Sequence, residues 1–233
     1  MQDEKIIIGL PSKGRLKLET EKLFHKIGLS TKIGSSERSY RNKLKNFPDV
    51  EIFYLQPVEI PLQLRLGSIH LGITGEDLLR EKIQILDKSV KILQKYNYGF
   101  AKLVVSVPKG WIDVDYMSDL EEVCNFFRKK NNRRLRVATK YPDLTRNFFS
   151  RFGIIHYITV ETLGATEGAP FNGLSEIIVD ITSSGKTLED NDMKVLKDGL
   201  IMSSSACLIQ SKKAKVSKSK KKILSKILGK LKS

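Results

Sequence analysis

EIIVDITSSGKTL, residues 176–188, begins with a short apolar run, continues through an acidic residue into a turn of small hydroxyl side chains, and ends at the start of a helix. A buried strand that passes through a tight turn into a helix is the repeating unit of α/β folds with mostly parallel sheets. The same rhythm occurs along most of the chain. It predicts strands at 6–10, 50–55, 69–74, 101–107, 135–139, 154–160 and 176–180, and helices at 16–27, 57–66, 118–131 and 141–152.

The rhythm breaks at a loop around Tyr96 and resumes after it, so the sequence predicts two lobes. We expect lobe I at residues 1–96 plus 191–211, lobe II with the small hydroxyl turn at 97–190, and a lysine-rich tail at 212–233. Residues 193–209 read as two extended segments broken by Gly199, and we expect the last of them to return to the first sheet.

Composition excludes several classes of protein. Of the 233 residues, 40% are hydrophobic and 29% charged, which suits a packed core and excludes wholesale disorder. No apolar run approaches the roughly 18 residues of a membrane span, and the N-terminus does not resemble a signal peptide. Cys124 and Cys207 are far apart in sequence, as expected for a reduced protein, so a cytoplasmic location is predicted.

The tail carries most of the net positive charge. Ten of the 41 Lys and Arg residues lie from Lys212 onward, where there is no acid, while the formal net charge of the whole chain is +15. Apolar residues from Ile223 to Leu231 line one face of a possible helix. The favoured interpretation is a solvated, partly disordered end; the alternatives are a helix that docks on a partner or a membrane surface, or a loose contact with a polyanion.

The turn after the strand at 176–180 favours phosphate binding. Ser183, Ser184 and Thr187 offer hydroxyl donors, Gly185 allows a close backbone approach, and amide groups at a helix start are open to an anion. The pattern is close to G-x-x-x-x-G-K-[ST], but Asp180 stands in place of the first glycine. A carboxylate there suits the two hydroxyls of a ribose 5-phosphate better than a triphosphate. The plain alternative is that Asp180 only caps the helix.

Weaker signals lie elsewhere in the chain. Lys13 and Arg15 flank Gly14 directly after the first strand, where ligands of α/β sheets bind, although an ordinary basic loop is equally compatible. Arg38 and Arg41 are individually weak. Glu167 is the one acid in a loop of small residues at 162–170. There is no C-x-x-C, H-E-x-x-H or G-x-S-x-G motif, and the three histidines are isolated, so neither a histidine-ligated metal site nor a nucleophile triad is expected.

Taken together, these segments resemble the ATP phosphoribosyltransferase family. The matching pieces, in order, are LPSKGRL at 10–16, EIP with LGITGEDLL within 59–79, VATKYPDLTRNFF at 137–149, GATEGAP at 164–170, GLSEIIVDITSSGKTL at 173–188 and SSACLIQ at 204–210. The resemblance implies two lobes like those of type II periplasmic binding proteins, with the active site in the cleft between them. It also implies transfer of the phosphoribosyl group of phosphoribosyl pyrophosphate to N1 of ATP, with Mg²⁺ carried by the pyrophosphate rather than by dedicated protein ligands.

The resemblance assigns roles by position. Asp180, Glu167, Lys13 and Arg15 take the catalytic positions, and Arg15, Arg38 and Glu167 take the nucleotide-binding positions. The phosphoribosyl pyrophosphate loop maps onto Asp180, Thr182, Ser183, Ser184, Gly185, Lys186 and Thr187.

The chain departs from the family at Gln56, where members usually carry an arginine, so a neighbour such as Arg38 or Arg41 must supply the cation or affinity falls. The resemblance also implies a short form without a regulatory domain, a homodimer of catalytic chains, and a hetero-oligomer with a subunit resembling histidyl-tRNA synthetase. No membrane contact and no specific nucleic-acid partner are expected. Two other functions stay open: a periplasmic-binding-like sensor of a phosphorylated ligand without turnover, and a nucleic-acid-binding protein led by the tail, which lacks aromatic residues.

Overall fold

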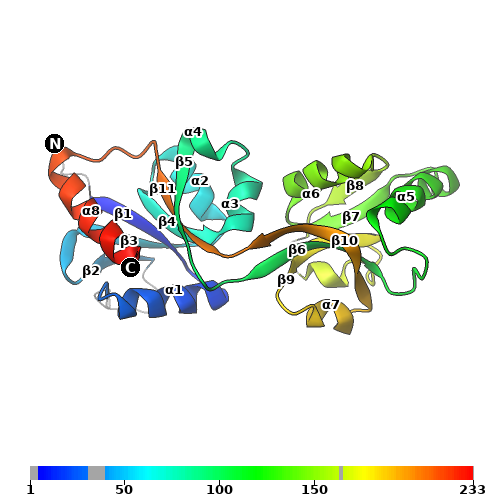
Figure 1. Ribbon diagram of the computed structural model, residues 1–233, viewed down its shortest axis with the longest axis horizontal. Helices are drawn as coiled ribbons and strands as arrows, with labels where there is room; N and C mark the ends of the chain where they lie inside the picture. The colour runs from blue at the N-terminus through cyan, green and yellow to red at the C-terminus, as the bar shows by residue number, and fades with distance from the viewer. Residues whose placement is uncertain (1–4, 31–39, 163–164, 233) are drawn as a thin grey trace. The chain divides into compact units, whose positions relative to one another are not determined.

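The computed structural model describes residues 5–30, 40–162 and 165–232, and the chain divides into two compact units. Unit 1 contains the chain up to Gly99 and again from Ser205, and unit 2 contains Phe100–Ser204 (Figure 1). Each unit has one mixed sheet covered by helices. The α/β class and the two lobes predicted from the sequence are therefore confirmed.

The sheet of unit 1 has six strands. Across the sheet these are β2 (Arg41–Leu44), β3 (Phe47–Leu55), β1 (Ile6–Pro11), β4 (Leu71–Gly75), β11 (Ala206–Ser211) and β5 (Val90–Lys95). Strands β3, β1 and β4 are parallel, whereas β11 runs antiparallel to both β4 and β5. The expected return of the chain to the first sheet is thus confirmed, with Cys207 opposite Thr74 of β4.

Helices cover both faces of this sheet because its strands are apolar on both sides. Ile6, Ile8 and Leu10 of β1 point to one face, where they join a core with Phe24 of α1 (Gly14–Lys26). The alternate residue Ile7 packs on the other face. That face is covered by α2 (Glu59–Leu66), α3 (Glu76–Lys82) and α4 (Leu86–Ser89).

The lysine-rich tail forms α8 (Lys218–Leu231), which packs on the α1 side of the sheet (Figure 1). Leu224, Ile227 and Leu231 are buried in the same core as β1, and the Lys220 ammonium lies 3.1 Å from the Asp49 carboxylate. The Tyr96 hydroxyl donates to the carbonyl of Leu231 at 2.9 Å. The expectation of a solvated, partly disordered end is wrong, because the apolar stripe of the tail completes the core of its own unit.

Truncating Ile227 to alanine should therefore lower the free energy of unfolding by about 2–4 kcal/mol, since Ile227 is fully buried. Ser225→Ala on the exposed side of the same helix should change it by less than about 0.5 kcal/mol. Chemical denaturation of the two variants checks this prediction. Equal small effects would mean that α8 is not part of the core.

Unit 2 has a five-stranded sheet. Its strands, in order across the sheet, are β10 (Met193–Ser204), β6 (Ala101–Pro108), β9 (Ile177–Thr182), β7 (Leu135–Thr139) and β8 (Tyr157–Val160). Strands β9, β7 and β8 are parallel, and β6 and β10 complete the sheet in antiparallel fashion. The remaining elements are α5 (Met117–Asn131), α6 (Pro142–Phe149), η1 (Ser150–Phe152), η2 (Thr166–Gly168) and α7 (Lys186–Asp190).

Two details differ from the sequence-based expectation. The chain returns to unit 1 at Ser205 rather than at Asn191, because β10 pairs with β6 along most of its length. Helix α5 begins after Tyr116, and its first-turn Asp119 accepts hydrogen bonds from the backbone N–H groups of Asp115 and Tyr116 at 2.9 and 2.8 Å. Ser118, the first residue of the helix expected at 118–131, is the second residue of α5.

Candidate active site

The carboxyl ends of the three parallel strands of unit 2 bring three segments of the chain together. The chain leaves the carboxyl end of β7 toward β8 on one side, and it leaves the carboxyl end of β9 toward β10 on the other side. The space between β7 and β9 is therefore a switch point in strand order. Ligands of α/β sheets bind at such points. Thr139 lies opposite Val179 in the parallel register, so the following residues, Lys140 and Asp180, emerge side by side.

The hydroxyl-rich loop that leaves β9 is held by its own side chains. The Thr182 hydroxyl accepts from the N–H of Gly185 at 2.8 Å, and the Ser184 hydroxyl accepts weakly from the N–H of Lys186 at 3.4 Å. The Ser183 hydroxyl donates to the carbonyl of Phe100 at 3.3 Å. Gly185 has φ +81°, a left-handed conformation that favours glycine. These contacts give the loop a defined shape.

The loop is exposed while its base is buried. Ser183, Ser184, Lys186 and Thr187 are all exposed, and the loop closes over Leu188, which is buried in the core with Ile178 of β9. Helix α7 has only five residues, so its dipole adds less to anion binding than the sequence suggested. Hydroxyl groups, loop amides and the Lys186 ammonium are the anion-binding groups that the loop offers.

Asp180 occupies a position that disfavours its ionised form. Burial raises the pKa of its carboxyl group above the ordinary value, and the nearby Glu167 charge raises that pKa further. The Ile181 N–H, the Lys140 charge and the Thr166 hydroxyl lower the pKa but do not outweigh the effect of burial. The Ile181 N–H donates at 2.8 Å. Asp180 does not cap α7, whose N-cap residue is Gly185. The helix-capping alternative is therefore excluded.

Helix η2 carries Glu167 to the same place. Thr166, the first residue of η2, is fully buried, and its hydroxyl oxygen lies 2.9 Å from that of Thr162. These two hydroxyl groups are hydrogen-bonded to each other, and Thr166 lies beside the Asp180 carboxylate. The structure thus brings together Asp180, Glu167 and the 182–187 loop, as the sequence predicted.

Sequence reasoning missed two members of the site. Lys140 is an exposed cation whose charge acts on Asp180, and Thr166 is a buried hydroxyl beside the same carboxylate. Lys140 directly follows the predicted strand at 135–139, and side chains that follow parallel strands meet at one edge. That rule, applied to this strand, would have identified it. Thr166 carried no comparable signal.

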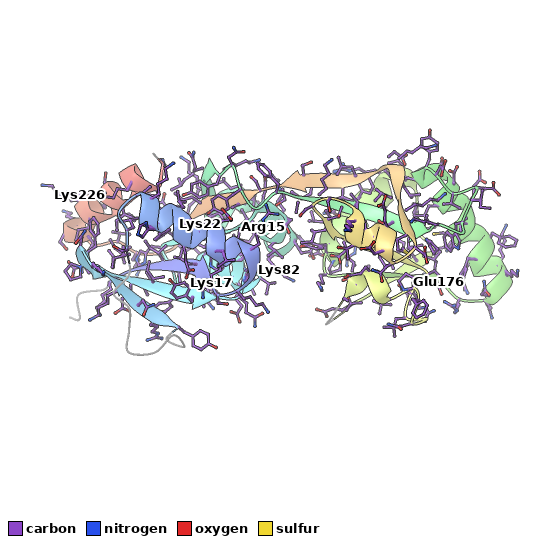
Figure 2. All side chains as sticks on the ribbon, turned by 90° about the horizontal axis from the view of Figure 1, so that it is seen from below. Arg15, Lys17, Lys22, Lys82, Glu176 and Lys226 are labelled. Atoms are coloured by element: carbon purple, nitrogen blue, oxygen red, sulfur yellow. The ribbon has the colours of Figure 1, made fainter. Side chains whose placement is uncertain are left out.

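Lys13 and Arg15 belong to unit 1. Both are exposed, at the point where β1 ends and α1 begins, and Figure 2 labels Arg15 at that end of α1. Among the described residues neither Lys13 nor Arg15 has an ion-pair or hydrogen-bond partner for its side-chain cation. The two charges are thus available to an anion.

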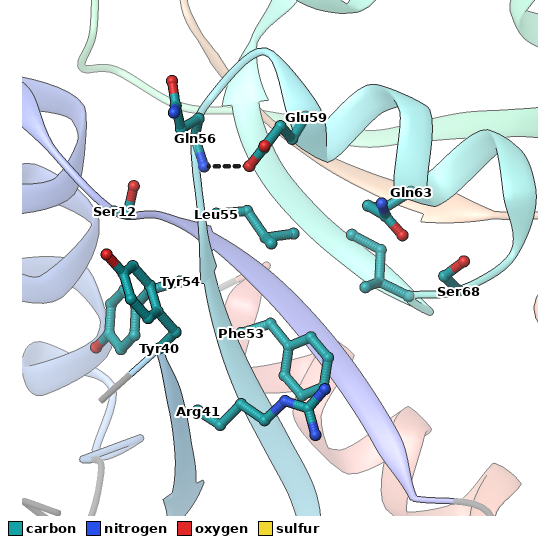
Figure 3. A pocket seen from close by; sticks show the side chains of 11 residues that line it. Ser12, Tyr40, Arg41, Phe53, Tyr54, Leu55, Gln56, Glu59, Gln63 and Ser68 are labelled. Atoms are coloured by element: carbon teal, nitrogen blue, oxygen red, sulfur yellow. Dashed lines mark hydrogen bonds between the residues drawn. The ribbon is translucent and has the colours of Figure 1, made fainter. Parts of the chain in front are cut away.

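Gln56 lines a pocket of about 450 Å³ in unit 1 (Figure 3). The backbone N–H of Gln56 donates to the Glu59 carboxylate at 3.0 Å. Arg41 lines the same pocket, with its guanidinium 4.6 Å from the centre of the Phe53 ring. Arg41 lies opposite Phe53 in the register of β2 and β3, three residues before Gln56, and Figure 3 shows the two side chains at opposite ends of the pocket. Arg38 lies outside the described residues.

The described residues contain neither a cluster of metal-binding side chains nor a helix that could cross a membrane. No group of three or more His, Cys, Asp and Glu side chains within 5–30, 40–162 and 165–232 is arranged to hold a metal ion. No helix in that part of the chain is both long and apolar enough to span a bilayer.

Residues 56–233 match the family model described as HisG, ATP phosphoribosyltransferase. The chain belongs to the ATP phosphoribosyltransferase family. The ATP phosphoribosyltransferase of Rhodopseudomonas palustris (strain BisB18) is 51% identical over 209 residues, which is 89% of this chain but only 64% of that protein. The ATP phosphoribosyltransferase of Rhizobium etli is 47% identical, with 89% of this chain matched to 90% of that one. The family indicated by the sequence motifs is thus confirmed.

Solved structures with a similar fold include a member of the same family. The ATP phosphoribosyl transferase (HisG:HisZ) complex from Thermotoga maritima contains a chain with 25% identity and a TM-score of 0.74, with 97% of this chain and 96% of that one covered. A substrate-binding protein of an amino acid ABC transporter has 15% identity and a TM-score of 0.54, over 97% of this chain and 92% of its own. The second likeness shows the fold alone, and it confirms the predicted two-lobed fold like that of type II periplasmic binding proteins.

Proposed function

We propose that this chain transfers the 5-phosphoribosyl group of phosphoribosyl pyrophosphate to N1 of the adenine of ATP with release of pyrophosphate, the first step of L-histidine biosynthesis. The observation that carries the proposal is the position of Asp180. Its carboxylate lies at the base of an exposed hydroxyl-rich loop, at a switch point of parallel strands, in a member of the ATP phosphoribosyltransferase family.

The residues of unit 2 hold the phosphoribosyl group in this proposal. The loop at 182–187 binds the 5-phosphate through hydroxyl groups, amides and the Lys186 ammonium. The Asp180 carboxylate accepts hydrogen bonds from the two ribose hydroxyls. Charge-assisted hydrogen bonds of this type each contribute roughly 1.5–3 kcal/mol. The pKa of Asp180, raised by burial, makes the bare carboxylate unfavourable, and two donors from a sugar would relieve that cost.

The chemical step breaks the bond between C1 of the ribose and a pyrophosphate oxygen, and forms a bond between C1 and N1 of adenine. C1 becomes cationic in the transition state, where the Asp180 carboxylate stabilises it. Neutral N1 offers a lone pair, so no general base is needed. Pyrophosphate leaves with the bonding electron pair, and the cations of Lys13 and Arg15 stabilise its charge. Mg²⁺ enters as part of the pyrophosphate substrate, and Glu167 lies beside Asp180 to contact the nucleotide.

Pyrophosphate release from phosphoribosyl pyrophosphate tests the function. We expect release by the full chain with Mg²⁺ only when ATP is present, since the acceptor is required. The runner-up function, a sensor of a phosphorylated ligand, predicts binding of phosphoribosyl pyrophosphate with no release under any of these conditions. The periplasmic-binding-like neighbours are compatible with a sensor only at the level of fold.

Lys140→Gln should shift the pH dependence of this activity. The Lys140 charge lowers the pKa of Asp180, so its removal raises that pKa and the ionised carboxylate appears only at higher pH. The acidic limb of the kcat/KM profile should therefore move to higher pH. Lys109→Gln, an exposed lysine of the same unit outside this site, provides the control. An unshifted limb would show that Lys140 does not act on Asp180.

The assembly and location are proposals of the same kind. We propose a homodimer of catalytic chains within a hetero-oligomer that contains a regulatory subunit resembling histidyl-tRNA synthetase, in the cytoplasm. The name of the Thermotoga maritima structure, a HisG:HisZ complex, supports a second subunit. Size-exclusion chromatography with light scattering, with and without such a subunit, distinguishes a mixed assembly from a homo-oligomer.

A further inference from the structure

A second pocket in unit 1 lies at the opposite end of β1 from Lys13. It has a volume of about 370 Å³ and is lined by Lys5, Ile7, Gly67, Ser68, His70, Lys213 and Lys215. Lys5 precedes β1, whereas Lys13 follows it, so this pocket is separate from the cations assigned to the active site. Its size is within the range of small-molecule sites in proteins.

The charges around this pocket are mostly positive. Lys5 is paired with Glu51 at 2.5 Å. For Lys213 and Lys215, the described part of the chain provides neither an ion-pair partner nor a hydrogen-bond acceptor for the ammonium group. Ser68 and His70 add polar groups to a lining whose one apolar side chain is that of Ile7. Such a lining favours a small anion.

The two lysines are attached to a segment that is fixed in place. The Ser211 hydroxyl donates to the carbonyl of Leu64 at 2.7 Å and accepts from the N–H groups of Lys213 and Ala214, both at 3.1 Å. The same segment crosses Gly67 so closely that a Cβ there would lie 3.0 Å from the backbone of Lys213. Gly67 has φ +83° and turns the chain without a side chain in the way.

His70 fixes the other lysine. This residue is 8% exposed, and its Nδ1 accepts from the N–H of Ile7 at 3.1 Å. Because Nδ1 is the acceptor, the ring proton is on Nε2, which donates to the carbonyl of Lys215 at 3.1 Å. The backbone of Lys213 is thus fixed by Ser211 and that of Lys215 by His70, at the rim of the pocket, while both side chains are exposed.

We propose that this pocket is a binding site for a phosphate dianion, either inorganic phosphate or the phosphate group of a small monoester. Lys213 and Lys215 bind its oxygens, together with the Ser68 hydroxyl. Charge-assisted contacts of this kind are the strong hydrogen bonds of proteins. The proposal does not depend on the activity of the 182–187 loop, which belongs to unit 2.

Titration of the isotopically labelled full chain with inorganic phosphate, at constant ionic strength and followed by amide NMR, tests the proposal. We expect saturable shifts at Gly67, Ser68 and His70. A parallel titration with glycerol 3-phosphate distinguishes free phosphate from a monoester, since the natural class should bind more tightly. The double variant Lys213→Gln/Lys215→Gln should weaken binding at these amides by about tenfold, which corresponds to about 1.4 kcal/mol.

The matched control is Lys221→Gln/Lys222→Gln, which removes the same charge from exposed positions of α8 outside the pocket. It should change the affinity less than twofold. Equal losses in the two double variants, or shifts along α8 as large as those at Gly67, would identify a diffuse counter-ion layer and overturn the site. Shifts at 182–187 report separately on the proposed function, so failure of either proposal is visible without the other.

Discussion

Replacing Asp180 by asparagine is expected to lower turnover by about 100-fold or more, the scale found when one group that stabilises transition-state charge is removed. The amide keeps the acceptor oxygen for the Ile181 N–H but loses the charge that stabilises the cationic ribose. The measurement is kcat for pyrophosphate release. Asp119→Asn is the control, because Asp119 accepts backbone N–H groups at the start of α5, outside the site.

The Asp180→Asn substitution should not lower the stability of the fold, although it lowers turnover. The pKa of Asp180 is raised in the folded chain, so the folded state binds its proton more tightly than the unfolded state. The contribution of Asp180 to stability therefore falls as pH rises from the ordinary aspartate pKa through the raised value. The Asp180→Asn substitution removes this cost, and the melting temperature at pH 7 should rise or stay unchanged. For Asp119, whose pKa is lowered, the asparagine variant should melt at a lower temperature while turnover is retained. Equal modest losses of turnover in both variants would contradict the ribose assignment.

Gly185→Val is expected to abolish measurable binding of phosphoribosyl pyrophosphate while the fold persists. A Cβ at this position meets no atom within 4 Å, so steric overlap within the protein is not the cause. The cause is φ +81°, which a β-branched residue avoids, so the loop must change its backbone where the phosphate binds. Isothermal titration calorimetry in the presence of Mg²⁺ measures the loss.

The control for this variant lies in the same unit. Gly153 has φ +69° and open space around it, so Gly153→Val introduces a comparable local strain after η1. Both variants should lose similar stability, yet only Gly185→Val should lose the ligand. Unchanged affinity in Gly185→Val would rule out the 182–187 loop as the phosphate site.

Much of the fold and of the site follows from short-range sequence patterns. Buried parallel strands are almost continuously apolar, which is why Ile6–Leu10 and Ile177–Val179 are recognisable without a structure. The turn after Asp180 is recognisable as a phosphate-binding loop because it combines a glycine with several hydroxyl side chains between a buried strand and a helix start. Asp180 and Glu167, 13 positions apart in sequence, meet because parallel strands end at a common edge.

The features that sequence reasoning missed depend on long-range pairing. Strand β2 is polar on a sheet edge, so nothing in its composition marks it. Lysines dominate the tail and favour a solvated interpretation, yet the burial of Ile227 in the core of β1 depends on a surface that only the folded unit presents. The boundary at Ser205 depends on the pairing of β10 with β6, which local composition does not encode.

The most direct test of the phosphoribosyl site is amide NMR of the labelled full chain titrated with phosphoribosyl pyrophosphate and Mg²⁺. We expect saturable shifts concentrated at residues 182–187, with further shifts at Lys140 and Glu167. The Asp180→Asn variant should reach the same loop shifts only at higher ligand concentration. Saturable binding that leaves the amides of 182–187 unshifted would contradict the central claim.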